Sequence, residues 1–531
     1  MLIIAQNISY TLPSRQVLFQ HIHFTLNKGD KAAIVGNNGT GKSTLLKILA
    51  GQLSATTGTI SKSNTLYYVP QHFGQYNALT VAQALGVDHK MAALTAILSG
   101  DTSEHYFGIL EDDWDIAERC EQALQQWELA HISLEQPFAR LSGGEKTKLF
   151  LAGISIFQPA VILLDEPTNH LDAYTRRRLY EWVATTNSTL LVVSHDRQLL
   201  QLCEPIWELT PAGIHAYGGN YAFYEQQKAQ EAVALQQRIT HDEKALKEAR
   251  KKQQQVMERK QREQSQAQKR SANGGIPKIL LNGRKNQSAN TMAKLKDVHM
   301  EKVSDLKSQL DQSSAAEQVS RLMKGHFEDA ALHNGKILVK ATGVNFAYPG
   351  ATPMWPEPLN FVINSGSRLA ITGSNGSGKS TLIKLIMGKL TPTKGELYTA
   401  PAHRLLLDQD YSLVDRHKTV LEQVSAFNEA LMEDHQLKTA LVRFLFDKDS
   451  WDKPCAALSG GETLRLALCC LTLQNKAPDM IILDEPANNL DLANIKMLTQ
   501  IFSDYRGTLI VVSHDTDFLQ EVRVNDFLLL S

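Results

Sequence analysis

Two eight-residue segments of the chain have residue types that suit phosphate binding. Glycine backbone N–H groups can point at phosphate oxygens, the final lysine adds charge at the β- and γ-phosphates, and the serine hydroxyl is a ligand for Mg²⁺. Both segments fit the Walker A signature, and a threonine follows each as a further candidate nucleotide-binding residue (Thr44 and Thr381). The segments are Gly36-Asn37-Asn38-Gly39-Thr40-Gly41-Lys42-Ser43 and Gly373-Ser374-Asn375-Gly376-Ser377-Gly378-Lys379-Ser380.

Each of these loops needs a strand before it and a helix after it. In the first half the apolar residues Ala32 to Val35 predict a short buried strand, and a helix is expected to begin near Ser43. The positive end of the helix dipole then faces the bound phosphates. The sequence therefore predicts two nucleotide sites that take ATP with Mg²⁺.

A pair of carboxylates follows an apolar run in each half. Val161 to Leu164 lead into Asp165 and Glu166, and the second half ends its run in Asp484-Glu485. A buried parallel strand delivers such acids to one edge of a sheet. We expect each aspartate to hold Mg²⁺ and each glutamate to polarise the attacking water as a general base. Two solvated acids at an exposed strand end would not explain the apolar run.

Leu141-Ser142-Gly143-Gly144-Glu145 resembles the signature of the ATP-binding cassette superfamily, and Ser459-Gly460-Gly461 matches it in the second half. The resemblance implies that the signature of one cassette closes over the γ-phosphate bound by the other. It also implies a D-loop at Leu171-Asp172, Q-loop residues that bind metal and nucleotide, switch histidines, and tyrosines that stack on adenine. Tyr10 also suits a position in the core. The Q-loop, switch and adenine residues are, in turn, Gln71 and Gln409, His195 and His514, and Tyr10 and Tyr348.

The two halves differ in spacing and in one motif. The loop lysines lie 337 residues apart and the glutamines 338, but the signature serines lie 317 apart, so the first half has 21 extra residues within about 72–140. We interpret these residues as a short arm that includes a helix near 111–128; a difference in loop length is the alternative. Thr168 and His170 become Ala487 and Asn489, which places equal turnover at the two sites in doubt.

The run from Asp165 to Asp172 and the run from Tyr217 to Tyr224 resemble the ABC-F proteins, soluble tandem cassettes that act on ribosomes. The expected fold class is α/β: two tandem P-loop ABC ATPase domains, 1–221 and 336–531, joined by a long antiparallel α-helical hairpin at 222–335. Head-to-tail pairing within one chain, as a monomer, would make two composite ATP sites.

A helical hairpin is the interpretation of the middle segment. Apolar residues spaced by four and three predict a modest coiled-coil seam on the outgoing helix, which would reach about 70 Å; a glycine and proline break over 273–277 precedes a return helix. From Lys244 to Lys296 there are 15 Lys and Arg residues against three acids, a net charge of +12. Seam positions are Leu235, Ile239, Asp242, Leu246, Ala249, Gln253 and Val256 going out, and Val303, Leu306 and Leu310 returning.

The charge of this segment suits contact with phosphate backbones, and the loop 278–285 suits a probe in structured RNA. A solvated, self-repelling linker is the alternative. The ABC-F resemblance implies that the linker contacts rRNA and the P-site or E-site tRNA, in a translation factor or in an antibiotic-resistance protein that protects ribosomes. The sequence does not separate these two roles, nor does it exclude a transporter ATPase subunit or a DNA-acting cassette protein.

Composition places further limits on the chain. With 531 residues and a formal net charge of −1, the whole-chain balance indicates no partner. No apolar run approaches the roughly 18 residues that a membrane helix needs. Five scattered cysteines form no metal-binding pattern and indicate reduced thiols. The expectation is a cytoplasmic protein without a membrane segment.

Overall fold

The computed structural model describes residues 2–62, 65–272, 303, 307, 335–429, 431–474, 476–488 and 490–530. The chain divides into two compact units, which are described separately. One unit contains Met1–Tyr224 together with Lys324–Ser531, and the other contains Glu225–Met323. Both copies of the nucleotide-binding motifs therefore belong to the first unit.

The first copy is built on a six-stranded sheet of order β5-β6-β7-β3-β8-β9. All neighbours in it are parallel except the last pair, β8 and β9. Every residue of β6 and β7 is buried, as expected for a parallel sheet covered on both faces. The bounds are β3 (Lys31–Val35), β5 (Leu66–Val69), β6 (Val161–Asp165), β7 (Thr189–Val193), β8 (Ile206–Thr210) and β9 (Gly213–Tyr217).

A second, antiparallel sheet of order β2-β1-β4 shares a core with this one. Helix α1 (Lys42–Ala50) contributes Leu45, Leu46 and Leu49 to a buried cluster that includes residues of both sheets. The helix that begins at the first phosphate loop is therefore held by packing along its length. The antiparallel strands are β1 (Ile3–Thr11), β2 (Val17–Leu26) and β4 (Thr57–Lys62).

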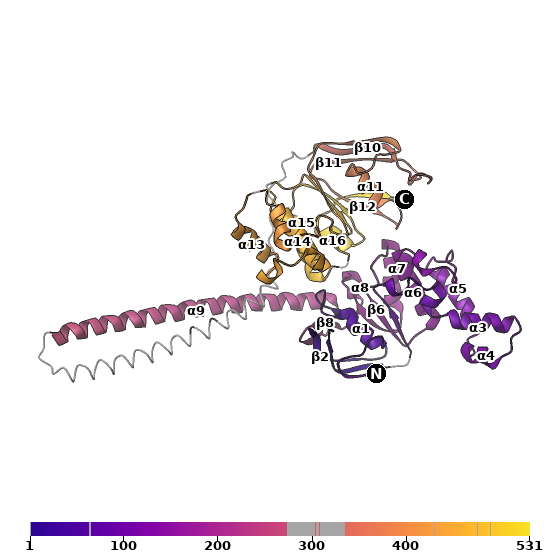
Figure 1. Cartoon of the computed structure of the whole chain (residues 1–531), viewed down its shortest axis with the longest axis horizontal. Helices are drawn as coiled ribbons and strands as arrows, with labels where there is room; N and C mark the ends of the chain where they lie inside the picture. The colour runs from indigo at the N-terminus through magenta and orange to yellow at the C-terminus, as the bar shows by residue number, and fades with distance from the viewer. Residues whose placement is uncertain are drawn as a thin grey trace. The chain divides into compact units, whose positions relative to one another are not determined.

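The helices of the first copy include an extra pair. Helix α3 (Asp88–Leu98) packs against α4 (Glu104–Leu110), as Figure 1 shows. In the sequence this pair follows α2 (Val81–Leu85) and precedes α5 (Ile116–Gln126). The predicted helix near 111–128 starts later than expected, because Glu111 and Asp112 have left-handed backbone angles and form a turn. The remaining elements are η1 (Gly74–Tyr76), η2 (Phe138–Arg140), α6 (Gly143–Phe157), α7 (Ala173–Thr185) and α8 (Arg197–Gln201).

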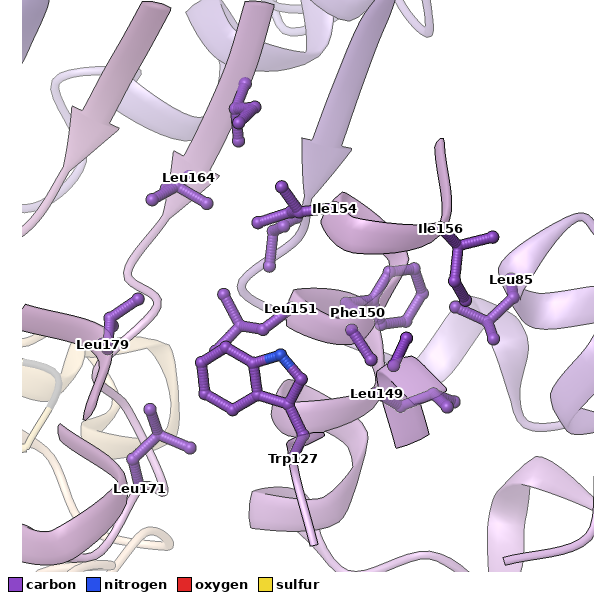
Figure 2. Close-up of a cluster of buried hydrophobic side chains, with 14 of the residues drawn as sticks. Leu85, Trp127, Leu149, Phe150, Leu151, Ile154, Ile156, Leu164, Leu171 and Leu179 are labelled. Carbon is purple, nitrogen blue, oxygen red and sulfur yellow. The ribbon is translucent and has the colours of Figure 1, made fainter. Parts of the chain in front are cut away.

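Beneath helix α6 lies the core that positions the motifs of the first copy. Figure 2 shows Leu151 of α6 beside Trp127, with Leu164 of β6, Leu171 and Leu179 of α7 around them. All five side chains are buried. Since the signature begins α6, the carboxylates end β6 and the D-loop precedes α7, one continuous core fixes the three motifs together.

The second copy repeats this architecture with fewer elements. Its parallel sheet has the order β14-β15-β16-β12-β17, and among the described residues no strand corresponding to β9 follows β17. The antiparallel sheet is β11-β10-β13. The strands are β10 (Ile337–Asn345), β11 (Leu359–Asn364), β12 (Arg368–Gly373), β13 (Lys394–Thr399), β14 (Arg404–Leu407), β15 (Met480–Asp484), β16 (Thr508–Val512) and β17 (Asp526–Leu530). The helices are α11 (Lys379–Ile386), α12 (Val420–Ala426), α13 (Asp434–Arg443), η3 (Lys448–Ser450), η4 (Cys455–Ala457), α14 (Gly460–Thr472), α15 (Leu492–Asp504) and α16 (Thr516–Glu521).

One uninterrupted helix, α9 (Tyr221–Ala272), leads into the second unit (Figure 1). Its 52 residues extend about 78 Å at 1.5 Å per residue. All seven outgoing seam positions are buried or half-buried, and over 229–259 only Ala245 and Met257 join them. The predicted seam is therefore confirmed on the outgoing helix.

The returning half of the predicted hairpin falls largely outside the described residues. Val303 and Lys307 are helical. Leu306, Leu310, the break over 273–277 and the loop 278–285 lie outside the described part, so those predictions stay predictions. Among the residues that the structure describes, no helix combines the length and apolar character that crossing a membrane requires.

Candidate ATP sites

The first phosphate loop is shaped by backbone angles and close packing. Gly36 has a φ of +152°, and a Cβ there would lie 2.6 Å from the carbonyl oxygen of Leu209, so only glycine fits. Lys42 Nζ donates to the carbonyl oxygens of Gly36 (2.7 Å) and Asn37 (3.1 Å). The lysine is thus held inside the loop, where its charge faces the position of a bound phosphate.

Several other loop residues are placed by local contacts. Gly41 and Gly378, both with left-handed angles, immediately precede α1 and α11. The Thr40 hydroxyl donates to the carbonyl oxygen of Asn37 at 2.9 Å. The remaining predicted residues lie either in the turn of a phosphate loop or in the first turn of the helix that follows it: Gly39, Thr44, Gly376, Ser380 and Thr381.

Oxygen ligands suited to Mg²⁺ meet beside this loop. Ser43 Oγ lies 2.9 Å from Asp165 Oδ1 and 3.5 Å from Gln71 Oε1. The Tyr68 hydroxyl donates to the other carboxylate oxygen, Oδ2, at 2.9 Å. Burial raises the pKa of Asp165, while the hydrogen bonds from Tyr68 and Ser43 oppose this shift. A hydroxyl, an amide oxygen and a carboxylate form a donor set that fits a hard divalent cation.

The predicted general base and switch histidine of the first copy lie together. Glu166 has a left-handed backbone (φ 49°), and its carboxylate oxygen Oε2 accepts the backbone N–H of His195 at 3.3 Å. The ring nitrogen Nε2 of His195 lies 3.4 Å from the other oxygen, Oε1. Burial raises the pKa of Glu166 to about 8 and lowers the pKa of His195. Within the described residues, Glu166 Oε1 and both ring nitrogens of His195 lack a hydrogen-bond partner. Such buried polar atoms suit a site that receives a polar ligand.

The second copy has the same arrangement of charged groups. Lys379 Nζ donates to the carbonyl oxygens of Gly373 (2.8 Å) and Ser374 (2.9 Å). Glu485 repeats the φ of 49°, and His514 Nε2 lies 3.4 Å from Glu485 Oε1. Burial raises the pKa of Glu485 to about 7 and lowers the pKa of His514 to about 4.

Around the metal carboxylate the two copies differ. Burial raises the pKa of Asp484, and a hydrogen bond from Ser380 opposes this shift. Leu406 stands where the first copy has Tyr68, since both occupy the third position before the Q-loop glutamine. Gln409 is exposed, whereas Gln71 is half-buried beside Ser43. The second site therefore has a looser set of metal ligands.

Both signatures begin helices through matching caps. The Ser142 hydroxyl accepts the Glu145 N–H at 3.3 Å, and the Ser459 hydroxyl accepts the Glu462 N–H at 3.4 Å. In return, each glutamate carboxylate accepts a hydrogen bond from the serine backbone N–H, which completes a capping box. The predicted glycines Gly143, Gly144, Gly460 and Gly461 form the first turns of these helices.

Within the first compact unit, each phosphate loop contacts the other copy. The Asn38 N–H donates to Asp491 Oδ2 at 2.9 Å, and Asn375 Nδ2 donates to the carbonyl oxygen of His170 at 2.9 Å. A Cβ on the signature glycine Gly144 would lie 3.1 Å from that Asn375 nitrogen. Thus the signature and the residue before the D-loop of one copy lie beside the phosphate loop of the other.

The tyrosines predicted to stack on adenine lie in different surroundings. Tyr10 is half-buried, with its ring 6.2 Å from that of Phe19 in the core of the first copy. Tyr348 is 42% exposed, and its hydroxyl lies 3.2 Å from the hydroxyl of Thr381 in α11. An exposed ring beside a phosphate loop is available for stacking, whereas Tyr10 has the packing of a core residue.

Three residues beside these sites were not predicted from the sequence as site residues. Tyr68 lies on β5, and the parallel pairing of β5 with β6 places it near Asp165. Trp355 donates its indole N–H to the carbonyl oxygen of Ser377 at 2.9 Å and supports the second loop. Arg176 on α7 binds the D-loop carbonyl of Leu171 at 3.1 Å. The last two come from segments without a motif, so spacing gives no signal for them.

Comparisons with known proteins agree with this geometry. A family model described as "ABC transporter" matches residues 19–169 and 356–488. The putative ATP-binding protein YdiF of Bacillus subtilis (strain 168) is 31% identical over 95% of this chain and 76% of its own length. ABC transporter F family member 5 of Arabidopsis thaliana is 28% identical over 95% of this chain and 72% of its own length. The chain belongs to the ABC-F family.

Among other ABC-F relatives, the ribosome protection protein VmlR of Bacillus subtilis (strain 168) is 30% identical, over 97% of this chain and 84% of its own. The fold is shared with an archaeal ribosome recycling factor, aABCE1, solved with the ribosomal stalk protein aP1. That structure has a TM-score of 0.58 and 18% identity, over 98% of this chain and 87% of that one. As an ABC-F protein, this chain has ABC domains that imply ATP and Mg²⁺ as ligands.

Proposed function

We propose that this ABC-F protein is a cytoplasmic ATPase that binds ribosomes through α9 and the segment after it, and that ATP-driven closure of the cassettes sets the position of that segment. The proposed domains are 1–221, 222–335 and 336–531. On the ribosome the basic segment would contact rRNA and the P-site or E-site tRNA, and the effect would be to modulate translation or to protect the ribosome from antibiotics.

The hydrolytic chemistry follows from the groups at each site. The phosphate loop and its lysine bind the β- and γ-phosphates, and the signature of the other copy completes the site. Mg²⁺, held by Ser43, Gln71 and Asp165, would neutralise charge on the phosphates. Glu166 accepts a proton from the attacking water, with His195 beside it to orient the γ-phosphate. The matching residues of the second copy have the same roles: Ser380, Gln409, Asp484, Glu485 and His514.

The observation that carries the proposal is the way α9 begins. Glu208, on strand β8 of the ATPase sheet, accepts hydrogen bonds from the hydroxyls of Tyr217 (3.2 Å) and Tyr224 (3.3 Å). The rings of these two tyrosines pack edge to face at 4.9 Å. Tyr221, the first residue of α9, is buried in the same core. The first turn of α9 is therefore anchored to the sheet whose strands end at the ATP site.

Charge along α9 supports a nucleic-acid partner. Residues 221–243 contain two basic and four acidic residues, whereas 244–272 contain ten basic and three acidic residues. Arg250, Lys251 and Lys252 are exposed. A helical segment whose positive charge is concentrated in its later part, and which has no aromatic residues there, suits contact with phosphate backbones. The names of VmlR and aABCE1 connect relatives of the same fold or family with ribosomes.

The test uses a double variant, Glu166→Gln with Glu485→Gln. It should bind ATP, hydrolyse it at least about a hundredfold more slowly than the unmodified chain, and sediment with ribosomes in ATP. A control chain that also carries Lys42→Ala and Lys379→Ala should remain free of ribosomes, because it cannot hold ATP. If the double glutamine variant binds ATP but sediments alone, ribosome binding by ATP-driven closure is refuted.

A further inference from the structure

The signature of the first copy has an aromatic residue on each side of it along the chain. Phe138 lies three residues before Leu141, and Phe150, on α6, lies five residues after Glu145. Both rings are buried and pack edge to face, with their centroids 6.2 Å apart. The ring of Tyr76, in η1, lies 5.9 Å from that of Phe138 and 5.0 Å from that of Phe150. Tyr76 therefore packs with the rings on both sides of the signature.

Further contacts join the same segments. The ring of Phe73 stacks on that of Phe150, with centroids 5.5 Å apart and planes 21° from parallel. Lys146, the first residue after the signature, has its ammonium 5.0 Å from the centroid of the Phe138 ring and donates to Asn77 Oδ1 at 3.1 Å. Aromatic pairs and cation–π contacts stabilise packing beyond the burial of area alone. Together they tie η1 and its neighbours to the start of α6.

The second copy has a cavity of about 200 Å³, lined partly by residues of its own signature. Tyr411, Val414 and Cys455 also line it. The Val414 N–H bonds to the carbonyl oxygen of Tyr411, three residues before it, at 2.9 Å. The Tyr76 N–H makes the same bond to Phe73 at 3.0 Å. Val414 is therefore the counterpart of Tyr76.

The other rings of the first copy are also replaced by smaller side chains. Cys455 begins η4 before the signature of the second copy, as Phe138 begins η2 before that of the first. Ala467 takes the place of Phe150, since each lies eight residues after its signature serine. The backbone N–H of both Phe138 and Cys455 bonds to the segment after the Q-loop, at 2.9 Å. The two copies thus share the backbone contact and differ in side-chain packing.

In the proposed mechanism the signature of the first copy completes the second site. A Cβ on Gly144 would lie 3.1 Å from Nδ2 of Asn375, in the second phosphate loop. Backbone N–H groups at a helix start bind phosphate when they point at it, and misplacement by about 1 Å can slow a reaction about a hundredfold. Rings that fix the start of α6 therefore act on the second site, whereas the cavity lies beside the signature that completes the first.

We propose that Tyr76 is a positioning residue for the second ATP site, because its ring holds Phe138 and Phe150 together and so fixes the signature of the first copy. The signature of the second copy, beside the cavity, is held less firmly for the first site. This inference rests on the proposed ATPase function and deepens it, since it makes the positioning of the two composite sites unequal.

The experiment measures ATP turnover in chains with one working site. In a Glu166→Gln chain only the second site works, and Tyr76→Val, which introduces the residue type of the second copy, should lower kcat about tenfold. KM for ATP should change less than about threefold, since the phosphate loop itself is unaltered. Tyr76→Phe is the matched control: it retains the ring and should keep kcat within about twofold of the parent value.

The companion chain carries Glu485→Gln, so that only the first site works, and Tyr76→Val should change its kcat less than about threefold. In this chain Val414→Tyr with Cys455→Phe rebuilds two rings in the cavity and should raise kcat about threefold. The same two changes should leave kcat of the Glu166→Gln chain within about twofold. Thermal unfolding beside each parent chain checks that the variants fold.

An unchanged kcat for Tyr76→Val in the Glu166→Gln chain would overturn the inference, as would equal slowing of both single-site chains, which a general loss of stability produces. A loss in Tyr76→Phe as large as that in Tyr76→Val would also overturn it, because the hydroxyl and not the ring would then matter. Unchanged first-site turnover after the cavity is filled in a folded chain would refute the role of the cavity. If the Glu166→Gln chain turns over no more ATP than the chain with both glutamates changed, the proposed ATPase function itself fails at the second site.

Discussion

The two cassettes repeat their chemical groups but differ where each sheet ends. In the first copy Ile206 on β8 is fully buried, since β9 and the start of α9 continue the fold beyond that strand. In the second copy the counterpart, Phe527 on β17, pairs with Ala370 as Ile206 pairs with Ala33, yet is 64% exposed. The comparison shows that β9 and the first turn of α9, with Tyr221 and Tyr224, complete the core of the first cassette.

A second difference lies at the ATP sites. In the first copy the Tyr68 hydroxyl binds the metal carboxylate, whereas the second copy has Leu406, which has no hydroxyl, at the corresponding position. The same lysine, aspartate, glutamate and histidine therefore operate in unequal surroundings. The following predictions test these differences, beginning with the largest expected effect.

The bases should give the largest effect. Changing both Glu166 and Glu485 to glutamine should lower ATP turnover by about two to four orders of magnitude, because general bases contribute that much. Of the single variants, Glu166→Gln should lose more activity, since the first site has the tighter set of metal ligands, with Asp165 bound by Ser43 and Tyr68. Phosphate release at saturating ATP measures this. A larger loss in Glu485→Gln would reverse the proposed order of the sites.

Truncating corresponding side chains on β8 and β17 should change the stability of the two cassettes by different amounts. Ile206→Ala should destabilise the first cassette by about 2–4 kcal/mol, because it leaves a cavity in a packed core. Phe527→Ala should change stability by about 0.5 kcal/mol or less, since the side chain is mostly in solvent. Thermal unfolding of the two variants beside the unmodified chain provides the measurement. Equal shifts would mean that β17 is covered in solution.

Replacing the two D-loop aspartates, Asp172 and Asp491, should affect ATP-driven cassette closure to different extents. Asp491→Ser keeps a residue able to cap α15 but removes the carboxylate that accepts the Asn38 N–H. Because a charge-assisted hydrogen bond contributes about 1.5–3 kcal/mol, its loss should raise the ATP concentration needed for half-maximal cassette closure about tenfold. Asp172 bonds to no residue of the second phosphate loop within the described chain, so Asp172→Ser should shift closure less. Scattering measured across an ATP titration distinguishes the two, and equal shifts would contradict the comparison.

The smallest effect concerns the metal ligand of the first copy. Tyr68→Phe removes one hydrogen bond of about 1 kcal/mol and should raise the Mg²⁺ concentration for half-maximal turnover about fivefold in a Glu485→Gln chain. Tyr67→Phe is the matched control, because the Tyr67 hydroxyl has no hydrogen-bond partner among the described residues. In a Glu166→Gln chain, Tyr68→Phe should have no effect. An equal effect in both chains would remove Tyr68 as a difference between the sites.

Some parts of the sites follow from sequence because their physics is local. Gly36 and Gly373 must be glycine for the backbone angles of their loops, and the lysine and serine follow at fixed positions on the helix that begins there. Apolar runs that end in Asp165 and Asp484 indicate buried strands. The seam on α9 follows from helical periodicity, and its burial matches the seven predicted positions. The helix near 111–128 was misplaced at its start because local periodicity does not locate a turn.

What the sequence by itself determined is therefore the set of motifs, their order and the long helix, since each depends on neighbours along the chain. Only the tertiary structure decided how the two copies differ. Arg176 and Ile495 are unremarkable helix residues until the fold brings them to one cavity with Glu166 and Asn488. Tyr68 gains its role because the parallel pairing of β5 and β6 places it beside Asp165. Contacts of this kind join residues distant in sequence, and only a folded core fixes the distances between them.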